Sequence, residues 1–249
     1  MAVFVGDLAG VRWSVSRRVV IACQPREEPT VSEPKTRTLG AVLYEDFELL
    51  DLYGPLEMFG SIGAELRIVT VAENTGPVAS FQRPKTVAEF DFASAPRLDL
   101  ILLPGGFGTI PQLENPAMLD FLRRRAGAAE VTMSVCSGSA ILAKAGLLDG
   151  RRATSNKQFF DLARAQGAAV KWVEQARWVE DGPFATSSGV SAGTDMALAV
   201  IAKLYGKEVA QQVAESTEYE WQQDSTRDPF VRFLNKGDAD EYLKRMGRA

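Results

Sequence analysis

The chain has 249 residues, of which 46% are hydrophobic and 24% are charged, values that are ordinary for a folded globular protein. Its net charge is −4 at pH 7 and it has no long basic run, so nucleic acid is not an expected partner. No stretch approaches the roughly 18 apolar residues that a membrane-spanning helix needs, and we therefore expect no membrane partner.

Two residue counts restrict the chemistry further. The two cysteines, Cys23 and Cys136, are too few for a disulfide framework and are consistent with a reducing, cytoplasmic location. The absence of histidine excludes every mechanism that needs an imidazole, including Cys-His and Ser-His-Asp catalysis. The same composition makes a zinc site unexpected. A general acid or base must then be a carboxylate, a lysine, a tyrosine or a thiol.

Composition divides the chain into three parts. Residues 1–37 are rich in proline and charge, above all between Pro25 and Pro34, and are predicted to be a leader or linker outside the folded domain. Residues 38–230 are predicted to form one domain. Residues 231–249 form a tail with room for a helix. About twenty residues are too few for a DNA-binding helix-turn-helix pair, so a transcriptional regulator is not expected.

Apolar runs and turn residues predict the elements of this domain. Strands or shorter extended pieces are predicted at residues 39–44, 66–72, 78–81, 87–90, 98–103 and 131–135, with a hairpin at 176–186 around Asp181-Gly182. Helices are predicted at residues 49–62, 116–126, 158–166, 192–205 and 208–215, and another begins near residue 140. Strands that alternate with helices indicate an α/β fold whose mainly parallel sheet is covered on both faces.

The most informative stretch is residues 131–142, where a short buried strand stops at Cys136 and turns at once into a helix. Ser137 and Gly138 are small enough for this sharp turn. The pattern is that of a nucleophile elbow with cysteine in the place of serine. The first N–H groups of the helix favour an anion, so the pKa of the thiol is predicted to be lowered. A structural cysteine that fills a small gap in the core is the alternative.

Two other regions carry residues suited to chemistry. Asp51 is flanked by leucines at the start of a predicted helix, where it is either an acid/base group or an N-cap. Gly105 and Gly106 follow a core strand and let the backbone approach a ligand closely, although a plain tight turn also explains them. Since ligands bind beyond the carboxyl ends of parallel strands, the fold should bring both regions to the edge that holds Cys136.

Four motifs together resemble the ThiJ/PfpI superfamily and, within it, the isonitrile hydratase branch. They are LLDLYGP (residues 49–55), LLPGGFG (102–108), SVCSGSAILAKAGLLDGRRAT (134–154) and SSGVSAGTDMAL (187–198). The resemblance implies the class I glutamine-amidotransferase-like fold, a flavodoxin-like three-layer α/β sandwich. It also implies a homodimer that acts on a small-molecule substrate with a cysteine nucleophile, without a metal and without a cofactor.

The resemblance also assigns roles to single residues. Cys136 matches the nucleophile and Asp51 the acid/base group, and the D-L-x-G-P pattern around Asp51 separates this branch from relatives that carry a glutamate. Ser137 stands where the hydratases have a catalytic-site threonine. Asn156 stands where many relatives have a histidine, which argues against glyoxalase- and protease-type activities. The positions implied for oxyanion or substrate binding are Gly105, Gly106 and Gly189.

The function that follows is hydration of an isonitrile, R–N≡C, to an N-substituted formamide. In this hypothesis Cys136 attacks the isonitrile carbon to give a thioimidate, and Asp51 moves the protons. One alternative is a non-catalytic or redox-responsive protein in which Cys136 is oxidised. Another is a hydrolase or lyase that uses the same two residues on a different small electrophile.

Overall fold

The computed structural model describes residues 36–248. Almost all of the predicted leader, residues 1–35, lies outside the described residues. Within them, seven strands form the central sheet in the order β10-β11-β7-β6-β1-β2-β5. These strands are β1 (Arg37–Val42), β2 (Leu66–Ala72), β5 (Phe90–Asp91), β6 (Leu100–Leu103), β7 (Val131–Ser134), β10 (Trp178–Asp181) and β11 (Phe184–Ser187).

The sheet is parallel except at one edge. There β10 and β11 pair antiparallel around Gly182, whose φ of 61° suits glycine, and the predicted hairpin is confirmed. Two small sheets stand apart from the central one. They are the antiparallel pair β3 (Gly76–Ala79) and β4 (Lys85–Ala88), and the parallel pair β8 (Arg152–Ala153) and β9 (Lys171–Trp172).

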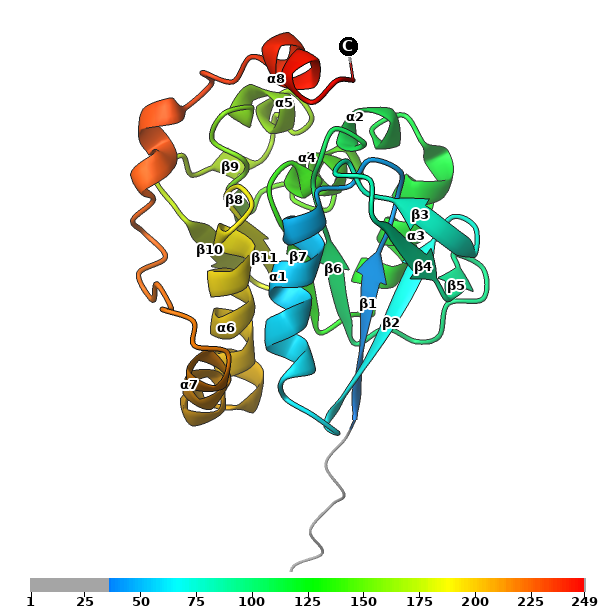
Figure 1. Ribbon diagram of the computed structural model, residues 1–249, viewed down its shortest axis with the longest axis vertical. Helices are drawn as coiled ribbons and strands as arrows, with labels where there is room; N and C mark the ends of the chain where they lie inside the picture. The colour runs from blue at the N-terminus through cyan, green and yellow to red at the C-terminus, as the bar shows by residue number, and fades with distance from the viewer. Residues whose placement is uncertain (1–35, 249) are drawn as a thin grey trace, which may run out of the picture. The chain divides into compact units, whose positions relative to one another are not determined.

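Helices cover both faces of the sheet, which confirms the predicted three-layer α/β fold. In Figure 1, α1 and α6 lie in contact in front of the sheet with α7 beside α6, while α3 and α4 lie behind it. Among residues 36–248, none of the helices combines the length and apolar character that a membrane crossing needs. The α-helices are α1 (Leu49–Gly60), α2 (Thr109–Gln112), α3 (Pro116–Ala126), α4 (Gly138–Lys144), α5 (Phe160–Arg164), α6 (Ala192–Tyr205), α7 (Lys207–Ser216) and α8 (Ala239–Arg245).

The central strands show why the sequence folds in this way. All residues of β6 and β7 are buried, as expected for parallel strands with helices on both sides. Helix α3 has the predicted bounds, because Asn115 accepts hydrogen bonds from two N–H groups of its first turn and Pro116 follows it. The predicted helix at 158–166 is shorter than expected and is restricted to α5.

The chain after α7 turns back toward the carboxyl ends of the strands. A 3₁₀ helix, η1 (Pro229–Phe233), leads to α8, which lies beyond those strand ends near α5 in Figure 1. Tyr242 of α8 stacks on Phe107, with their ring centroids 5.4 Å apart. The C-terminal tail therefore contributes directly to the edge of the sheet where the candidate residues lie.

Candidate active site

Cys136 occupies a sharp turn between β7 and α4. Its φ is 57°, in the left-handed region that residues other than glycine rarely adopt, and its N–H donates to the Ser188 carbonyl oxygen at 3.1 Å. A Cβ on Gly138 would lie 2.7 Å from the carbonyl oxygens of Leu103 and Pro104, so the turn requires glycine there. The side chain of Cys136 is held in a strained, buried position that is 7% exposed.

Asp51 lies in α1 with 0% of its surface exposed. Its Oδ2 accepts a hydrogen bond from the N–H of Gly105 at 2.8 Å, whereas Oδ1 has no hydrogen-bond partner among the described residues. The N-cap position of α1 belongs to Glu48, so the capping interpretation of Asp51 is wrong. Burial raises the pKa of the Asp51 carboxyl well above its usual range, and the Gly105 N–H and the nearby Cys136 thiol oppose this rise.

The predicted lowering of the Cys136 pKa is wrong. Burial raises the pKa of this thiol well above its usual range, and the charge of Asp51 raises it further. The side chain of Asn156 and the N–H of Ser137 act in the opposite direction but are weaker. The loss of water around the sulfur is the largest of these contributions to its pKa. Burial of both groups and the charge of Asp51 beside the thiol therefore favour protonation in this site.

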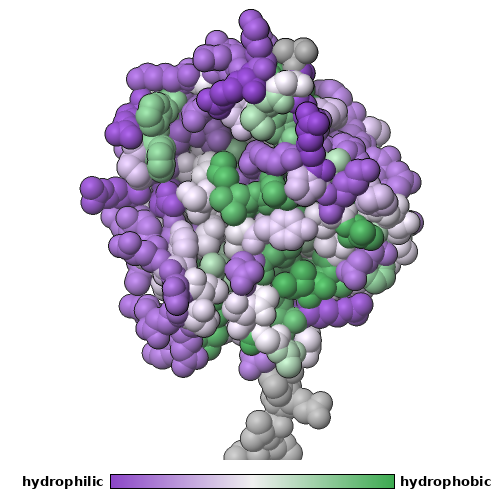
Figure 2. Space-filling view, in the orientation of Figure 1, coloured by the Kyte–Doolittle hydropathy of each residue, from purple (hydrophilic) through white to green (hydrophobic). Residues whose placement is uncertain are grey.

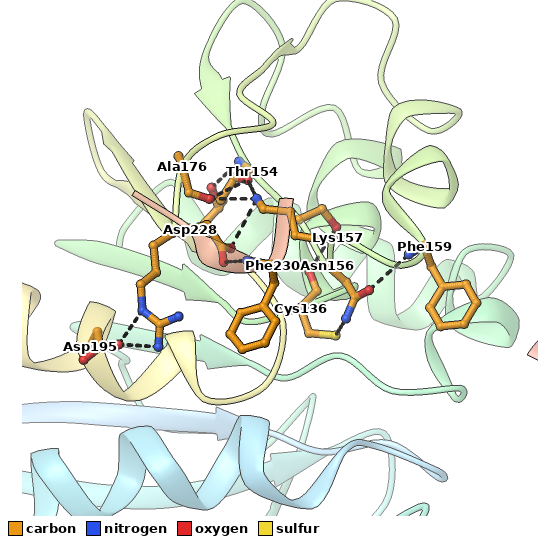
Figure 3. Close-up of polar contacts among 12 residues, drawn as sticks. Cys136, Thr154, Asn156, Lys157, Phe159, Ala176, Asp195, Asp228 and Phe230 are labelled. Carbon is orange, nitrogen blue, oxygen red and sulfur yellow. Dashed lines mark hydrogen bonds and ion pairs between the residues drawn. The ribbon is translucent and has the colours of Figure 1, made fainter. Parts of the chain in front are cut away.

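Asn156 contacts the reactive sulfur directly (Figure 3). Its Nδ2 donates to Cys136 Sγ at 3.0 Å, and its Oδ1 accepts from the N–H of Phe159 at 3.1 Å. The second bond fixes the orientation of the amide, so the group that faces the sulfur is a donor. A Cβ on Gly189 would lie 2.7 Å from Asn156 Nδ2. Gly189 thus leaves room for the amide beside Cys136, and the sequence signalled Asn156 only as a departure from the pattern of its relatives.

The structure gives Gly105 and Gly106 partners within the protein. The Gly105 N–H is bound by Asp51, and the Gly106 N–H donates to Ser137 Oγ at 3.1 Å. The hydroxyls of Ser137 and Thr109 are 2.9 Å apart. A Cβ on Gly105 would lie 2.6 Å from the Ser137 nitrogen, so this turn needs glycine for close packing. The N–H groups of Gly105 and Gly106 therefore position Asp51 and Ser137, and the backbone donor that faces the sulfur is the N–H of Ser137.

A pocket of about 270 Å³ opens above Cys136 and Ser137. The carboxylate of Glu48, also at its wall, accepts a hydrogen bond from Gln82 Nε2 at 2.6 Å, and burial raises the pKa of this group. Neither Glu48 nor the apolar wall was predicted from the sequence. The apolar lining residues are Phe107, Ile110, Phe159, Leu162, Val190, Ala239 and Tyr242.

The site as a whole is a thiol at the base of a largely apolar pocket, with the buried Asp51 carboxyl interacting with it from behind the lining. Across residues 36–248, no three His, Cys, Asp or Glu side chains are grouped so that they would hold a metal ion. A flavodoxin-like sandwich with a strained cysteine between a strand and a helix defines a protein of the class I glutamine-amidotransferase-like fold. Residues 39–203 match the DJ-1/PfpI family, and the chain belongs to that family.

Individual relatives agree with this assignment. The chain is 36% identical over 181 residues to an isonitrile hydratase of Pseudomonas putida, an alignment that covers 73% of this chain and 78% of that protein. A crystal structure of a ThiJ/PfpI family protein from Pseudomonas syringae has a TM-score of 0.69 and 30% identity, over 91% of this chain and 92% of that one. The transcriptional regulator CdhR of Pseudomonas aeruginosa is 30% identical over 65% of this chain but only 48% of its own length. The family therefore includes an enzyme and a regulator among the relatives of this chain.

Proposed function

We propose that the protein hydrates an isonitrile to an N-substituted formamide. The observation that carries this proposal is the buried Asp51 carboxyl, which interacts with the Cys136 thiol and raises its pKa. A carboxyl whose pKa is raised by burial is a better proton acceptor than an exposed one and can return the proton later, as the reaction requires. The identity to an isonitrile hydratase supports the same reaction.

The first step joins the sulfur to the substrate carbon. Asp51 accepts the proton of the Cys136 thiol, and the thiolate forms an S–C bond with the terminal carbon of R–N≡C. The same carbon then takes the proton from Asp51, which gives the thioimidate R–N=CH–S–Cys136. No net charge is left in the pocket, which suits a site with an apolar wall.

The second step hydrolyses this intermediate. Asp51 deprotonates a water molecule, whose oxygen adds to the thioimidate carbon while the nitrogen gains a proton. The tetrahedral species R–NH–CH(OH)–S–Cys136 then loses its S–C bond, and its hydroxyl proton returns through Asp51 to the sulfur. The products are R–NH–CHO and the free thiol, so water is the only co-substrate.

Asn156 and Ser137 stabilise sulfur whenever it carries negative charge. The Asn156 Nδ2 group and the Ser137 N–H both lower the pKa of Cys136, which means that both favour the thiolate. Neither group gives up a proton at neutral pH, so they stabilise the charge without competing with Asp51 for the proton.

A redox-responsive role is the alternative hypothesis for this site. Cys136 lines the pocket, and oxidation by peroxide would require its thiolate, which the raised pKa disfavours unless Asp51 takes the proton. Use of the same pair on another small electrophile remains a competing hypothesis and is tested together with the hydratase reaction.

The direct test is incubation of purified protein with a panel of alkyl and aryl isonitriles, with the formamide measured by NMR. We expect formamide formation that saturates with substrate and is absent in Cys136→Ala. If no member of the panel is hydrated while the Cys136 thiol remains free, the proposal is contradicted, and other small electrophiles should then be tried.

For the assembly we expect a cytoplasmic homodimer. Leu50 and Tyr53 of α1 and Val87 of β4 are large hydrophobic residues with 47%, 45% and 61% of their surface exposed. Figure 2 shows hydrophobic groups toward the middle of this face, within a hydrophilic rim. Sedimentation analysis of the purified protein, with Leu50→Asp as the disrupting variant, tests this expectation.

A further inference from the structure

We propose that the pocket selects isonitriles whose R group is apolar, uncharged and about the size of one ring, and that Tyr242 of the C-terminal helix determines this selectivity. The inference rests on the proposed function, because it names the class of isonitrile that the same site accepts. It follows from the chemistry of the wall, the volume of the pocket, its charge and the anchoring of α8.

Three aromatic rings, Phe107, Phe159 and Tyr242, form part of the apolar wall of the pocket. Phe107 stacks on Tyr242 with ring centroids 5.4 Å apart and meets Phe159 edge-on at 6.2 Å. Phe81 stacks against both Phe107 and Tyr242 from outside the pocket lining, at 4.8 and 5.8 Å. Such a cluster holds its members in fixed positions and presents ring surfaces to an apolar ligand. An R group in this pocket would therefore have ring surfaces to pack against on one side and aliphatic side chains on the other parts of the wall.

The volume limits the size of the R group. The pocket measures about 270 Å³. A dry engineered cavity of about 150 Å³ binds benzene, and pockets for drug-sized ligands begin at about 300 Å³. The space above Cys136 therefore covers a single ring with the isonitrile group, and a larger R group would extend toward the opening of the pocket.

The charges at the wall exclude an anionic substrate. Among the described residues that line this pocket there is no lysine and no arginine, whereas Glu48 contributes a carboxyl. An R group with a carboxylate would lose water without gaining a cation and would lie near another acid. Both effects oppose binding.

Tyr242 is held in place by contacts on both sides of α8. On the C-terminal side, Arg248 Nη1 lies 2.5 Å from Asp46 Oδ1, and its Nη2 donates to the Phe81 carbonyl oxygen at 2.8 Å. On the N-terminal side, the N–H of Gly237 donates to the carbonyl oxygen of Gln158 at 3.0 Å. These contacts tie the last segment of the chain to three separate parts of the domain. The ring of Tyr242 is therefore a fixed wall of the pocket, supplied from outside residues 39–203 that match the family.

The test compares a ring-sized with a small substrate. For the wild type we expect a higher kcat/KM for benzyl isonitrile than for methyl isonitrile. Tyr242→Ala should reduce this ratio by about tenfold, the scale expected when an aromatic contact is lost from a well-packed pocket. Tyr242→Phe keeps the ring and should preserve the ratio. Phe230→Ala, which removes an exposed aromatic ring from outside the pocket lining, is the control.

Binding to Cys136→Ala, which cannot turn over, separates this inference from the proposed function. N-benzylformamide should bind this variant more tightly than N-methylformamide and more tightly than 4-(formamidomethyl)benzoate, which carries a carboxylate. Glu48→Gln in the same background should weaken the discrimination against the carboxylate. Tyr242→Ala in that background should weaken N-benzylformamide binding about tenfold. This is the factor expected for kcat/KM, because the same aromatic contact is lost.

Two outcomes tell the proposals apart. Equal efficiency with benzyl and methyl isonitrile, or a ratio unchanged by Tyr242→Ala, overturns the selectivity inference and leaves isonitrile hydration standing. Binding of N-benzylformamide that depends on Tyr242, without hydration of either isonitrile, overturns the proposed function instead.

Discussion

Two aspartates of this protein are equally buried but have opposite surroundings. Asp51 and Asp195 both have 0% of their surface exposed. Asp195 Oδ2 lies 2.5 Å from Arg177 Nη2, and its Oδ1 accepts from the Tyr219 hydroxyl at 3.0 Å and from a backbone N–H. Asp51 has one backbone donor, and its Oδ1 has no hydrogen-bond partner among the described residues. Figure 3 shows the paired arrangement of Asp195.

The difference separates a structural carboxylate from a reactive one. Burial raises the pKa of Asp195 as well, but Arg177, the Tyr219 hydroxyl and a backbone N–H oppose this rise and hold α6 to the chain around Tyr219. A buried carboxyl without a cation is destabilised as an anion, which favours its protonated form and raises its pKa. Asp51 is therefore suited to proton transfer, whereas Asp195 forms a structural ion pair that stabilises the fold.

The largest expected effect comes from the partner of Asp51. Cys136→Ser should abolish formamide production, because the hydroxyl of serine is far less acidic than a thiol and Asp51 cannot generate the alkoxide. The fold should persist, since serine is close to cysteine in size. Enzyme assays and circular dichroism check the two statements, and Cys23→Ala, at the other cysteine of the chain, should change neither. Substantial turnover by Cys136→Ser would exclude covalent thiolate catalysis.

The next effect concerns Asp51 itself. Asp51→Asn keeps size and polarity but cannot carry a proton between sulfur, carbon and water. Turnover should fall by about 10²- to 10⁴-fold, the usual contribution of an acid/base group. The charge of Asp51 raises the pKa of Cys136, so its removal should lower that pKa and speed alkylation of the thiol by iodoacetamide at pH 7.

The two readouts of Asp51→Asn move in opposite directions if Asp51 is the proton carrier. In a redox-responsive protein, faster oxidation of Cys136 would be the main change and there would be no hydration to lose. If the hydration rate of this variant is unchanged, Asp51 is not part of the mechanism. The different surroundings of Asp51 and Asp195 would then not correspond to different functions.

Loss of the ion pair at Asp195 should change the stability of the protein and not its catalytic activity. Arg177→Met leaves Asp195 buried without its cation and should lower the free energy of unfolding by about 3–5 kcal/mol. The activity per folded molecule should stay close to that of the wild type, because neither Arg177 nor Asp195 lines the catalytic pocket. Urea denaturation and active-site titration measure the two quantities. Normal stability with lost turnover would show that the two aspartates are not as different as their contacts indicate.

Most of the fold could be predicted from the sequence because its signals are local. Continuous apolar runs indicated the parallel strands, and the Asp181-Gly182 turn indicated the hairpin. Helices α3 and α6 have the predicted bounds, since proline, an N-cap or glycine marks their ends. The two-residue strands β8 and β9 were not predicted, because so short a pairing depends on which segments meet in space.

The site was predictable only in part for the same reason. Cys136, Asp51 and the glycine turn stand in recognisable motifs, and the structure brings them together. Glu48, the contact of Asn156 with the sulfur and the ring of Tyr242 depend on long-range packing that no local pattern reveals. The thiol pKa was predicted in the wrong direction because the sequence shows the start of a helix but not the burial that outweighs it.

A third buried carboxylate, Asp228, also has a cation beside it. The expected effect of this pair on stability is the smallest of those considered. Asp228 is 4% exposed, and its Oδ2 lies 3.7 Å from Lys157 Nζ (Figure 3). The ammonium group also donates to Thr154 Oγ1 at 2.8 Å and to the Ala176 carbonyl oxygen at 2.7 Å. This pair is looser than Arg177–Asp195, and burial lowers the pKa of Lys157 from 10.5 to about 8.

The direction of the pH effect follows from that lowered pKa. Below pH 8, lysine is protonated in both the folded and the unfolded chain, so the burial cost of its charge is constant. Between pH 8 and 10.5 the unfolded chain binds this proton and the folded chain does not, so the contribution of Lys157 to the free energy of unfolding rises with pH, by up to about 1.4 kcal/mol per pH unit.

The double variant Lys157→Met with Asp228→Asn removes the lysine without leaving an unpaired carboxylate. Relative to this variant, the wild-type free energy of unfolding in urea should climb between pH 8 and 10. If the difference in free energy of unfolding stays constant over this range, Asp228 keeps Lys157 charged. The pair would then be a structural ion pair like Arg177–Asp195.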